Sequence, residues 1–551
     1  MIPKNIYKFI YKNRVEIFAA LLLLIYFIQS VYIILNIGMI GDEQFYPGVG
    51  KYLIETKDFG PGSPFVLRSH PVLSYYINSI FLIFDKNPVW SHKPFDMSAN
   101  AQAYGLDNLL FLTRLPIALT GVLLGFFIFR WSRKLYGNKA ALIALILFSF
   151  EPTILGNSSI VTSDLVATTF IFIAVYYFWC LLKNSSKSSL IIAGFALGLA
   201  LLSKFTALLL IPITLVLFFY FGKISLKTAK RAVIYYIIAF LVIWAFYGFQ
   251  FDSMINVVHS NEKATDFINQ TFHSEGMKSL VTNLMNVPVP VPAYLNAALG
   301  YNIWHSTEGH ISFLMGETSV HGWWYFYIIA YLIKTPISIL LFLFMFTIFL
   351  ASKKIKMKKD WLFIVLPIIA TFIFLSFFIG FDIGLRHLMI AYPFIFVILS
   401  SIVTANLKKH QKRILNLFII ALLIWYVFEA VTFLPYNMSY FNQFIGKPEN
   451  GYLWLSDANI DIGQGINEVG KYAKQHNLTS LYISTPIPKS FWNYYGNFSY
   501  ASCQPANGIY AISIDMLNMI RRDCYSWLRE RTPDAILGYS TFVYNVTDIN
   551  I

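Results

Sequence analysis

Two adjacent carboxylates, Asp42 and Glu43, directly follow a long apolar segment that runs from Val15 to Ile40. A carboxylate held at such a place can take the proton from a substrate hydroxyl as a general base. Acidic residues at the end of an apolar helix can equally cap the next helix or interact with water in a loop. The choice between these interpretations depends on the other ionisable residues that the chain brings to the same face of the membrane.

Further ionisable residues adjoin apolar segments and lie, in the topology derived below, on the same side as the two carboxylates. They are His70, Arg114, Asp164, Lys204, Glu308, His310, Arg386 and His387. Ionisable groups next to a bilayer core are costly and therefore indicate function, although lysine and arginine at helix ends also extend along the helix to reach water. Both interpretations stay open for Arg114 and Lys204. Arg386 and His387 begin an apolar segment, which favours function.

Carboxylates and cations together at a membrane face suit the transfer of a group from a lipid phosphate to a hydroxyl. The leaving phosphate needs cations that stabilise its charge, and the hydroxyl needs one base that takes its proton. A phosphate leaving group needs no second acid, whereas glycosidases use paired carboxylates because their leaving group must be protonated. One base and several cations are therefore sufficient for this reaction.

The composition indicates what kind of scaffold positions these residues. Of the 551 residues, 57% are hydrophobic and only 13% are charged, whereas globular proteins have about 25% charged residues. The net charge of +14 is concentrated in short Lys and Arg clusters between apolar segments, so it indicates topology rather than a nucleic-acid partner. The first apolar segment lacks a small-residue cleavage site, and we expect it to be retained. The sequence predicts a polytopic α-helical membrane protein.

About eleven membrane-spanning helices are predicted from the apolar segments. They lie near residues 15–40, 109–129, 140–155, 164–183, 189–221 (two short helices that meet at Ser203-Lys204), 232–249, 323 onward, 361–380, 385–405 and 414–434. Lys12 and Arg14 precede the first span, so the positive-inside tendency places the N-terminus in the cytoplasm. Every large basic cluster then lies on the cytoplasmic side, and both long polar loops, 41–108 and 250–321, lie outside.

The composition changes near residue 437, which divides a membrane domain, 1–436, from a C-terminal domain, 437–551. Short strand-like segments at 480–484, 509–513 and 535–539 and a helical pattern at 466–475 predict a small extracytoplasmic α/β domain. Cys503 and Cys524 could form a disulfide in an extracytoplasmic domain, and this stays open.

Short motifs along nearly the whole chain resemble those of family 39 glycosyltransferases. The motifs are Gly41-Asp42-Glu43, His70-Pro71, Thr113-Arg114-Leu115-Pro116, Thr162-Ser163-Asp164, Ser203-Lys204-Phe205-Thr206, Gly309-His310, Leu314-Met315-Gly316-Glu317, His321-Gly322-Trp323-Trp324-Tyr325, Lys334-Thr335-Pro336, Gly384-Leu385-Arg386-His387, Ser439-Tyr440-Phe441-Asn442 and Glu449-Asn450-Gly451-Tyr452. That family includes the protein O-mannosyltransferases and the aminoarabinose transferases that act on lipid A, all of the GT-C fold. Each motif is weak alone, but their order and their topological sides together are specific.

The resemblance implies a GT-C membrane glycosyltransferase whose donor is a sugar on a polyprenyl phosphate. It implies Asp42 as the general base with Glu43 beside it, and Asp164 as a further acid of the site. Donor-phosphate binding is expected from Lys204, Arg386, Arg114 and His387, and His70, Glu308 and His310 are other site candidates. The acceptor hydroxyl would belong to a protein or to a lipid or glycan, and the active site would face outward from the plasma membrane.

Two departures leave the acceptor open. The chain has His70-Pro71-Val72-Leu73 where the mannosyltransferases often have His-Pro-Pro-Leu, and it has no counterpart of the MIR domain of the eukaryotic enzymes.

His305, Glu308 and His310 have ligand types that zinc accepts, but their spacing is not the zincin pattern, and histidines in loops are usually solvated. We therefore expect neither a metal ion nor another cofactor to be required.

Two other functions compete with this interpretation. An oligosaccharyltransferase-like protein shares the fold class, but Trp323-Trp324-Tyr325 lacks the Asp-Tyr-Gly continuation of that signature. A transporter would have paired halves and ionisable groups near the bilayer midplane, whereas here the charges lie at one face and no internal symmetry is evident.

Overall fold

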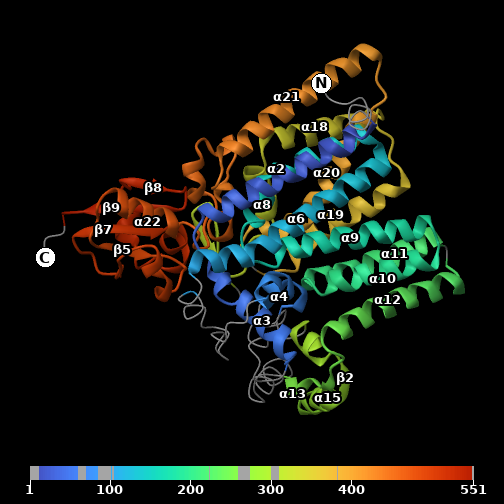
Figure 1. Cartoon of the computed structure of the whole chain (residues 1–551), viewed down its shortest axis with the longest axis horizontal. Helices are drawn as coiled ribbons and strands as arrows, with labels where there is room; N and C mark the ends of the chain where they lie inside the picture. The colour runs from blue at the N-terminus through green and yellow to red at the C-terminus, as the bar shows by residue number, and fades with distance from the viewer. Residues whose placement is uncertain are drawn as a thin grey trace. The chain divides into compact units, whose positions relative to one another are not determined.

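The computed structural model describes residues 12–59, 70–84, 101, 105–222, 224–257, 274–298, 310–380 and 382–548, and helices predominate (Figure 1). The chain forms two compact units. The first unit comprises Met1–Gly41, Ile117–Ile160 and His310–Ile551, and the second comprises Asp42–Pro116 and Val161–Gly309. Each unit combines separate stretches of the chain, so contacts between residues that are distant in sequence hold each of them together.

The second unit contains four apolar helices after residue 163. They are α9 (Asp164–Lys183), α10 (Lys187–Leu201), α11 (Leu210–Gly222) and α12 (Leu226–Phe246), which lie side by side in Figure 1. Gly194 and Gly198 are one turn apart on α10, where an added Cβ atom would come within 2.8 Å of Ile238 and 2.6 Å of Val242 on α12. Because these two residues lack side chains, α10 and α12 approach closely, as small residues allow in membrane helices.

A break between α10 and the 3-10 helix η3 (Phe205–Leu209) is packed against a shorter helix, α4 (Val72–Ser79). The backbone N–H of Leu73 donates to the carbonyl of Leu202 at 3.0 Å, and the hydroxyl of Ser74 donates to the carbonyl of Ser203 at 3.1 Å. These bonds satisfy carbonyl groups that the end of a helix leaves without an intrahelical partner. The helix α4 therefore supports the break that carries Lys204.

The other elements of the second unit are short. They are the 3-10 helix η1 (Gly41–Gln44), which begins at the last residue of the first unit, α3 (Tyr46–Thr56), η2 (Ile80–Phe84), α13 (Met254–Val257), α15 (Glu275–Asn286) and an antiparallel ribbon of β1 (Phe251–Ser253) and β2 (Pro288–Pro290).

The first unit holds the remaining apolar helices. They are α2 (Arg14–Asn36), most of α6 (Leu106–Tyr136), α7 (Asn138–Ser149), α8 (Pro152–Asn157), α17 (Phe326–Lys334), α18 (Ile337–Ala351), α19 (Leu362–Phe377) after η4 (Lys359–Trp361), α20 (Tyr392–Ser400) between η5 (Leu385–Ala391) and η6 (Ser401–Thr404), and α21 (Lys409–Thr432). Every residue of α20 is buried, so this helix forms the centre of the unit. In contrast, α21 exposes Ile414, Ile424 and Phe428, as a lipid-facing helix does.

The C-terminal part of the first unit is a small mixed sheet with one amphipathic helix, α22 (Ile466–Gln475). Its strands are β5 (Leu481–Ser484), β6 (Phe498–Tyr500), β7 (Gly508–Ser513), β8 (Ala535–Leu537) and β9 (Thr541–Val546), in the order β6-β5-β7-β9-β8. β5 is parallel to β6 and β7, and β9 is antiparallel to β7 and β8. Cys503 and Cys524 form a disulfide. The predicted helix and three predicted strands are present, whereas β6 and β9 were not predicted.

Smaller turns connect these elements. They are the β3 (Ser312–Leu314) and β4 (Glu317–Ser319) hairpin, the 3-10 helices η7 (Asn437–Ser439), η8 (Gln443–Ile445), η9 (Pro448–Leu453), η10 (Asp457–Asn459) and η11 (Lys489–Tyr494), the π-helical turn η12 (Met516–Ile520), and α23 (Ser526–Arg529).

Eight helices among the described residues are long and apolar enough to cross a membrane, or up to nine if α17 and α18 together make one bent span. This establishes a multi-pass membrane protein. The predicted segments at 140–155 and 189–203 correspond to α7 and α10, which are apolar but shorter. The predicted eighth span is not one straight helix, because α17 and α18 meet at 111°. Pro336 lacks a backbone N–H and forces Thr335 into an extended conformation, which ends α17. The number of eleven crossings stays a prediction.

Candidate functional site

Glu43 is a buried carboxylate of the second unit that an arginine and a backbone amide hold in place. The guanidinium of Arg114 donates from Nε to Oε1 and from Nη2 to Oε2, each at 2.7 Å, and neither side chain is exposed. The backbone N–H of Val161 donates to Oε1 at 3.1 Å. Bidentate Arg–carboxylate pairs are strong and geometrically specific. Glu43 therefore joins three separate stretches of the second unit: η1, the start of α6 and the segment before α9.

Asp42 precedes Glu43 in η1 and differs from it in its environment. Asp42 keeps partial exposure to solvent, whereas Glu43 is completely buried. Of the two acids, Glu43 is paired with Arg114 in a buried site, and Asp42 is the one that keeps exposure to solvent. The sequence predicted both acids at the site, and the structure assigns them different environments.

Asp164 and Lys204 form a second ion pair in this unit. The ammonium Nζ of Lys204 lies 2.6 Å from Oδ1 of Asp164, and both side chains are largely buried. Asp164 is the first residue of α9, where a negative charge interacts favourably with the helix dipole. An ammonium has three N–H donors, so one bond to Asp164 leaves Lys204 with donor capacity. The sequence placed these two residues at one face of the membrane but did not pair them.

His70 lies at the start of α4 in an aromatic cluster. Its ring stacks on Tyr46 with centroids 5.9 Å apart, and Tyr46 contacts Tyr75 at 4.9 Å. The second unit thus contains Asp42, Glu43, His70, Arg114, Asp164 and Lys204.

The other predicted residues belong to the first unit or lie outside the described part. Arg386 and His387 lie in η5, and His387 is buried. His310 places Nδ1 2.8 Å from the carbonyl oxygen of Ile311. Glu308 and His305 lie outside the described residues. Within the described ranges, no three His, Cys, Asp or Glu side chains are grouped to hold a metal ion.

Asp382 and Lys334 are among the buried charges of the first unit that were not assigned from the sequence. Asp382 accepts the backbone N–H of Trp323 at 2.6 Å, and its burial raises its pKa to about 7. Lys334 donates to the carbonyls of Met438 and Asn459, and its ammonium lies 4.5 Å from the centre of the Phe441 ring. Lys334 belongs to the Lys334-Thr335-Pro336 motif, so a signal for it was present in the sequence.

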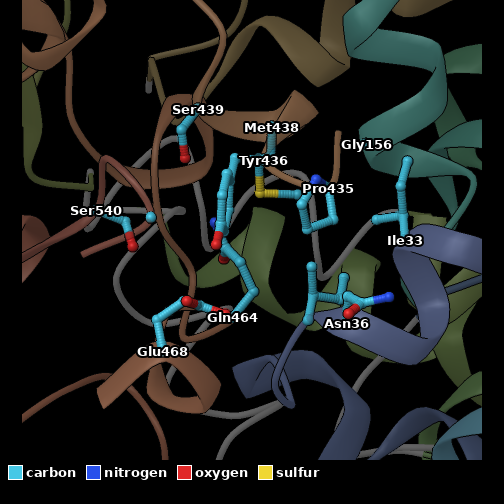
Figure 2. Close-up of a pocket in the computed structure, with 13 residues that line it drawn as sticks. Ile33, Asn36, Gly156, Pro435, Tyr436, Met438, Ser439, Gln464, Glu468 and Ser540 are labelled. Carbon is cyan, nitrogen blue, oxygen red and sulfur yellow. The ribbon is translucent and has the colours of Figure 1, made fainter. Parts of the chain in front are cut away.

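One pocket of the first unit is shown in Figure 2. It lies between the end of α2 and the C-terminal segments and is lined by residues such as Asn36, Tyr436, Gln464 and Ser540. Its cavity volume of about 20 Å³ is enough for about one water molecule. A cavity of this volume does not hold a sugar.

Residues 106–249, which include Arg114, Asp164 and Lys204, match the family described as dolichyl-phosphate-mannose-protein mannosyltransferase. The match agrees with the motifs in this segment, so the resemblance to this glycosyltransferase family is confirmed there. The helical membrane part and the C-terminal sheet expected of its GT-C fold are both present.

Solved structures are similar to the chain over most of its length. Two structures of ArnT from Cupriavidus metallidurans, one bound to undecaprenyl phosphate and one in the apo state, give a TM-score of 0.49 and 11% identity over 97% of this chain and 98% of that chain. The apo oligosaccharyltransferase of Archaeoglobus fulgidus gives a TM-score of 0.46 and 14% sequence identity. This similarity covers 87% of this chain and 59% of that chain. No curated protein is detectably similar in sequence. The sequence similarity to the mannosyltransferase family rests on residues 106–249.

Proposed function

We propose that this chain transfers a sugar from a polyprenyl-phosphate donor to an acceptor hydroxyl at the extracytoplasmic face of the plasma membrane. The observation that carries the proposal is the separation of the two adjacent acids. Arg114 and the Val161 amide hold Glu43 in place, so Asp42 is the accessible carboxylate in a unit that also contains the Asp164–Lys204 pair. This is the combination of one base and cations that transfer from a lipid phosphate requires.

In the proposed reaction, the oxygen of the acceptor hydroxyl attacks the anomeric carbon of the donor sugar. The bond between that carbon and the phosphate oxygen breaks, and its electron pair leaves with the phosphate. The proton of the hydroxyl passes to the carboxylate of Asp42. No bond to a cofactor is made, and the proposal requires no metal ion.

Lys204 is the proposed cation for the leaving phosphate on the second unit. Its ammonium is held in place by Asp164, and an ammonium has three N–H donors, which supports a role toward phosphate oxygens. Arg386 and His387 remain proposed phosphate ligands from the first unit. For Arg114 the geometry favours a positioning role, because its guanidinium makes two hydrogen bonds to Glu43.

Two observations support the outward orientation of the site. The Cys503–Cys524 disulfide is typical of a domain that folds in an oxidising compartment. The basic clusters also alternate with the apolar segments along the chain. The positive-inside tendency places these clusters in the cytoplasm and the loop that carries Asp42 on the other side of the membrane.

The family description names dolichyl-phosphate mannose, which supports a polyprenyl-phosphate sugar as the donor class and mannose as the first sugar to test. The acceptor hydroxyl belongs to a protein or to a lipid or glycan.

The test uses the purified full chain with radiolabelled dolichyl-phosphate mannose and a panel of undecaprenyl-phosphate sugars. Single-turnover transfer is then compared between the wild type, Asp42→Asn and Glu43→Gln. A positioned general base contributes about 100- to 10,000-fold in rate, so Asp42→Asn should slow transfer on that scale and leave donor binding nearly unchanged. Near-normal turnover by a folded Asp42→Asn variant would exclude Asp42 as the base.

Glu43→Gln distinguishes the two acids by stability. It removes the negative charge opposite the buried Arg114 guanidinium, so it should lower the melting temperature, which Asp42→Asn should not. If the sugar were released from none of the polyprenyl phosphates by the folded wild type, the proposed function itself would be wrong.

A further inference from the structure

The segment that leads to Asp42 is held by the C-terminal domain. Residues 37–40, which connect α2 to η1, form no helix or strand. The backbone N–H of Gly38 donates to the carbonyl of Gln464 at 2.9 Å, and that of Gly41 donates to the carbonyl of Ile462 at 3.0 Å. Two separate stretches of the first unit therefore run beside each other immediately before the proposed base.

Side chains of the C-terminal domain complete this contact. The N–H of Met39 donates to the hydroxyl of Tyr495 at 2.9 Å, and the amide Nδ2 of Asn467 donates to the carbonyl of Asn36 at 2.7 Å. Met39 and Ile40 are completely buried. A buried backbone N–H that loses its acceptor is costly, so each of these bonds fixes the path of the chain.

The turn that makes these contacts is itself rigid. Oδ1 of Asp461 accepts the N–H of Gly463 at 2.8 Å, and Oε1 of Gln464 accepts the N–H of Ile462 at 2.8 Å. Figure 2 shows Gln464 of this turn and Glu468 of α22 lining the same pocket as Asn36 at the end of α2.

Close packing excludes a looser arrangement. An added Cβ atom at Gly38 would lie 2.6 Å from Ile466 and 2.9 Å from the carbonyl oxygen of Gln464. Gly463 has φ of +116°, and a Cβ atom there would lie 3.1 Å from the carbonyl oxygen of Met39. Because Gly38 and Gly463 lack side chains, the backbone of residues 37–41 can approach that of residues 462–466 closely.

We infer that the C-terminal domain is a positioning element for the Asp42–Glu43 turn, with Tyr495 and Asn467 as its positioning residues. The inference rests on the proposed role of Asp42 as the base. Gly41 is bonded to Asp42, so the hydrogen bonds to residues 38–41 fix the direction in which the chain enters η1. A small misplacement of a catalytic group can cost about 100-fold in rate even when the substitution is remote from the chemistry.

The test compares Tyr495→Phe with the matched control Tyr494→Phe in the purified full chain. The two tyrosines are neighbours, but Tyr494 is exposed and only the Tyr495 hydroxyl accepts the Met39 N–H. Tyr495→Phe removes that acceptor and keeps the ring. We expect faster hydrogen–deuterium exchange in peptides that cover residues 37–45, and a kcat for the polyprenyl-phosphate sugar lowered by about 10- to 100-fold with an unchanged KM. The control should match the wild type in both measurements.

A merely structural effect has a different signature. It would lower the melting temperature and the active fraction, and the exchange rate would rise throughout the first unit rather than at residues 37–45. Asn467→Ser serves as the second variant, because it removes the donor to the Asn36 carbonyl by an independent route. Unchanged exchange at 37–45, or unchanged kcat, in both Tyr495→Phe and Asn467→Ser would overturn the inference.

The exchange measurement separates this inference from the proposed function. Asp42→Asn could keep full activity while exchange at 37–45 responds to Tyr495→Phe. Asp42 would then not be the base, and the C-terminal domain would have no positioning role in catalysis. If Asp42→Asn is inactive but Tyr495→Phe and Asn467→Ser both transfer sugar normally, the proposed function stands and the inference is wrong.

Discussion

Arg114→Met should destabilise the protein strongly, because it leaves the Glu43 carboxylate in a completely buried site with no cation opposite it. Both hydrogen bonds from Arg114 to Glu43 are 2.7 Å long and neither side chain is exposed, so solvent does not screen the pair. Removing one partner of a buried pair costs about 3–5 kcal/mol. The remaining N–H of Val161 compensates only part of this loss. That cost is large beside a total stability of about 5–15 kcal/mol for typical proteins.

The double variant Glu43→Gln/Arg114→Met provides the control for this prediction. Replacing both charges removes the uncompensated carboxylate, and such replacements are often nearly neutral. We expect the double variant to recover most of the melting temperature that Arg114→Met loses, measured by thermal unfolding of the full chain in detergent. A single variant as stable as the wild type would refute the reasoning. So would a double variant as unstable as Arg114→Met.

Three further substitutions have expected directions, which follow for Lys204 from the proposed function and for Gly198 and Asp382 from the structure. Lys204→Gln should weaken binding of undecaprenyl phosphate by about 10- to 100-fold, the equivalent of one charge-assisted hydrogen bond of about 1.5–3 kcal/mol, and unchanged affinity in a binding titration would assign Lys204 a structural role. Gly198→Leu should lower the melting temperature, because a Cβ atom there would lie 2.6 Å from Val242 and overpacking costs about 1–3 kcal/mol. Phe195→Leu, at an exposed position of the same helix, should leave the melting temperature unchanged. Equal melting temperatures of the two variants would contradict this. Burial raises the pKa of Asp382 to about 7, so the folded protein binds a proton more tightly than the unfolded chain, and stability should fall as pH rises from about 4 to 7. Asp382→Asn should flatten that part of the melting-temperature profile, and an unchanged slope would contradict the assignment.

The sequence was most informative where a local pattern determines the structure. The helix Ile466–Gln475 was predicted with its observed bounds because its apolar residues recur at helical spacing. Strand β9, Thr541–Val546, was not predicted, although its Phe, Val and Tyr residues favour strands. Strand β6 has only three residues and pairs at the edge of the sheet, which is too short for a period of two to be recognised.

The pairing of charges could not be predicted in the same way. Glu43 and Arg114 were both placed at the outer face, but 71 residues separate them, and nothing local specifies which cation faces which acid. Their partnership arises from burial, because only a bidentate pair makes two completely desolvated charges tolerable. The same applies to Asp164 and Lys204, whose pairing depends on the break after α10 and on its support by α4.

The two acids of η1 show how neighbouring residues of equal charge acquire different roles. In a 3-10 helix, successive side chains point about 120° apart, so Glu43 can be buried against Arg114 while Asp42 keeps partial exposure. The proposed base then lies, along the chain, between two fixed points. Before it, Gly41 is bound to Ile462, and after it, Glu43 is bound to Arg114 and Val161. A base must be accessible to its substrate and must also keep its position. The hydrogen bonds to both neighbours of Asp42 restrain the backbone on either side of it, and its side chain keeps partial exposure to solvent.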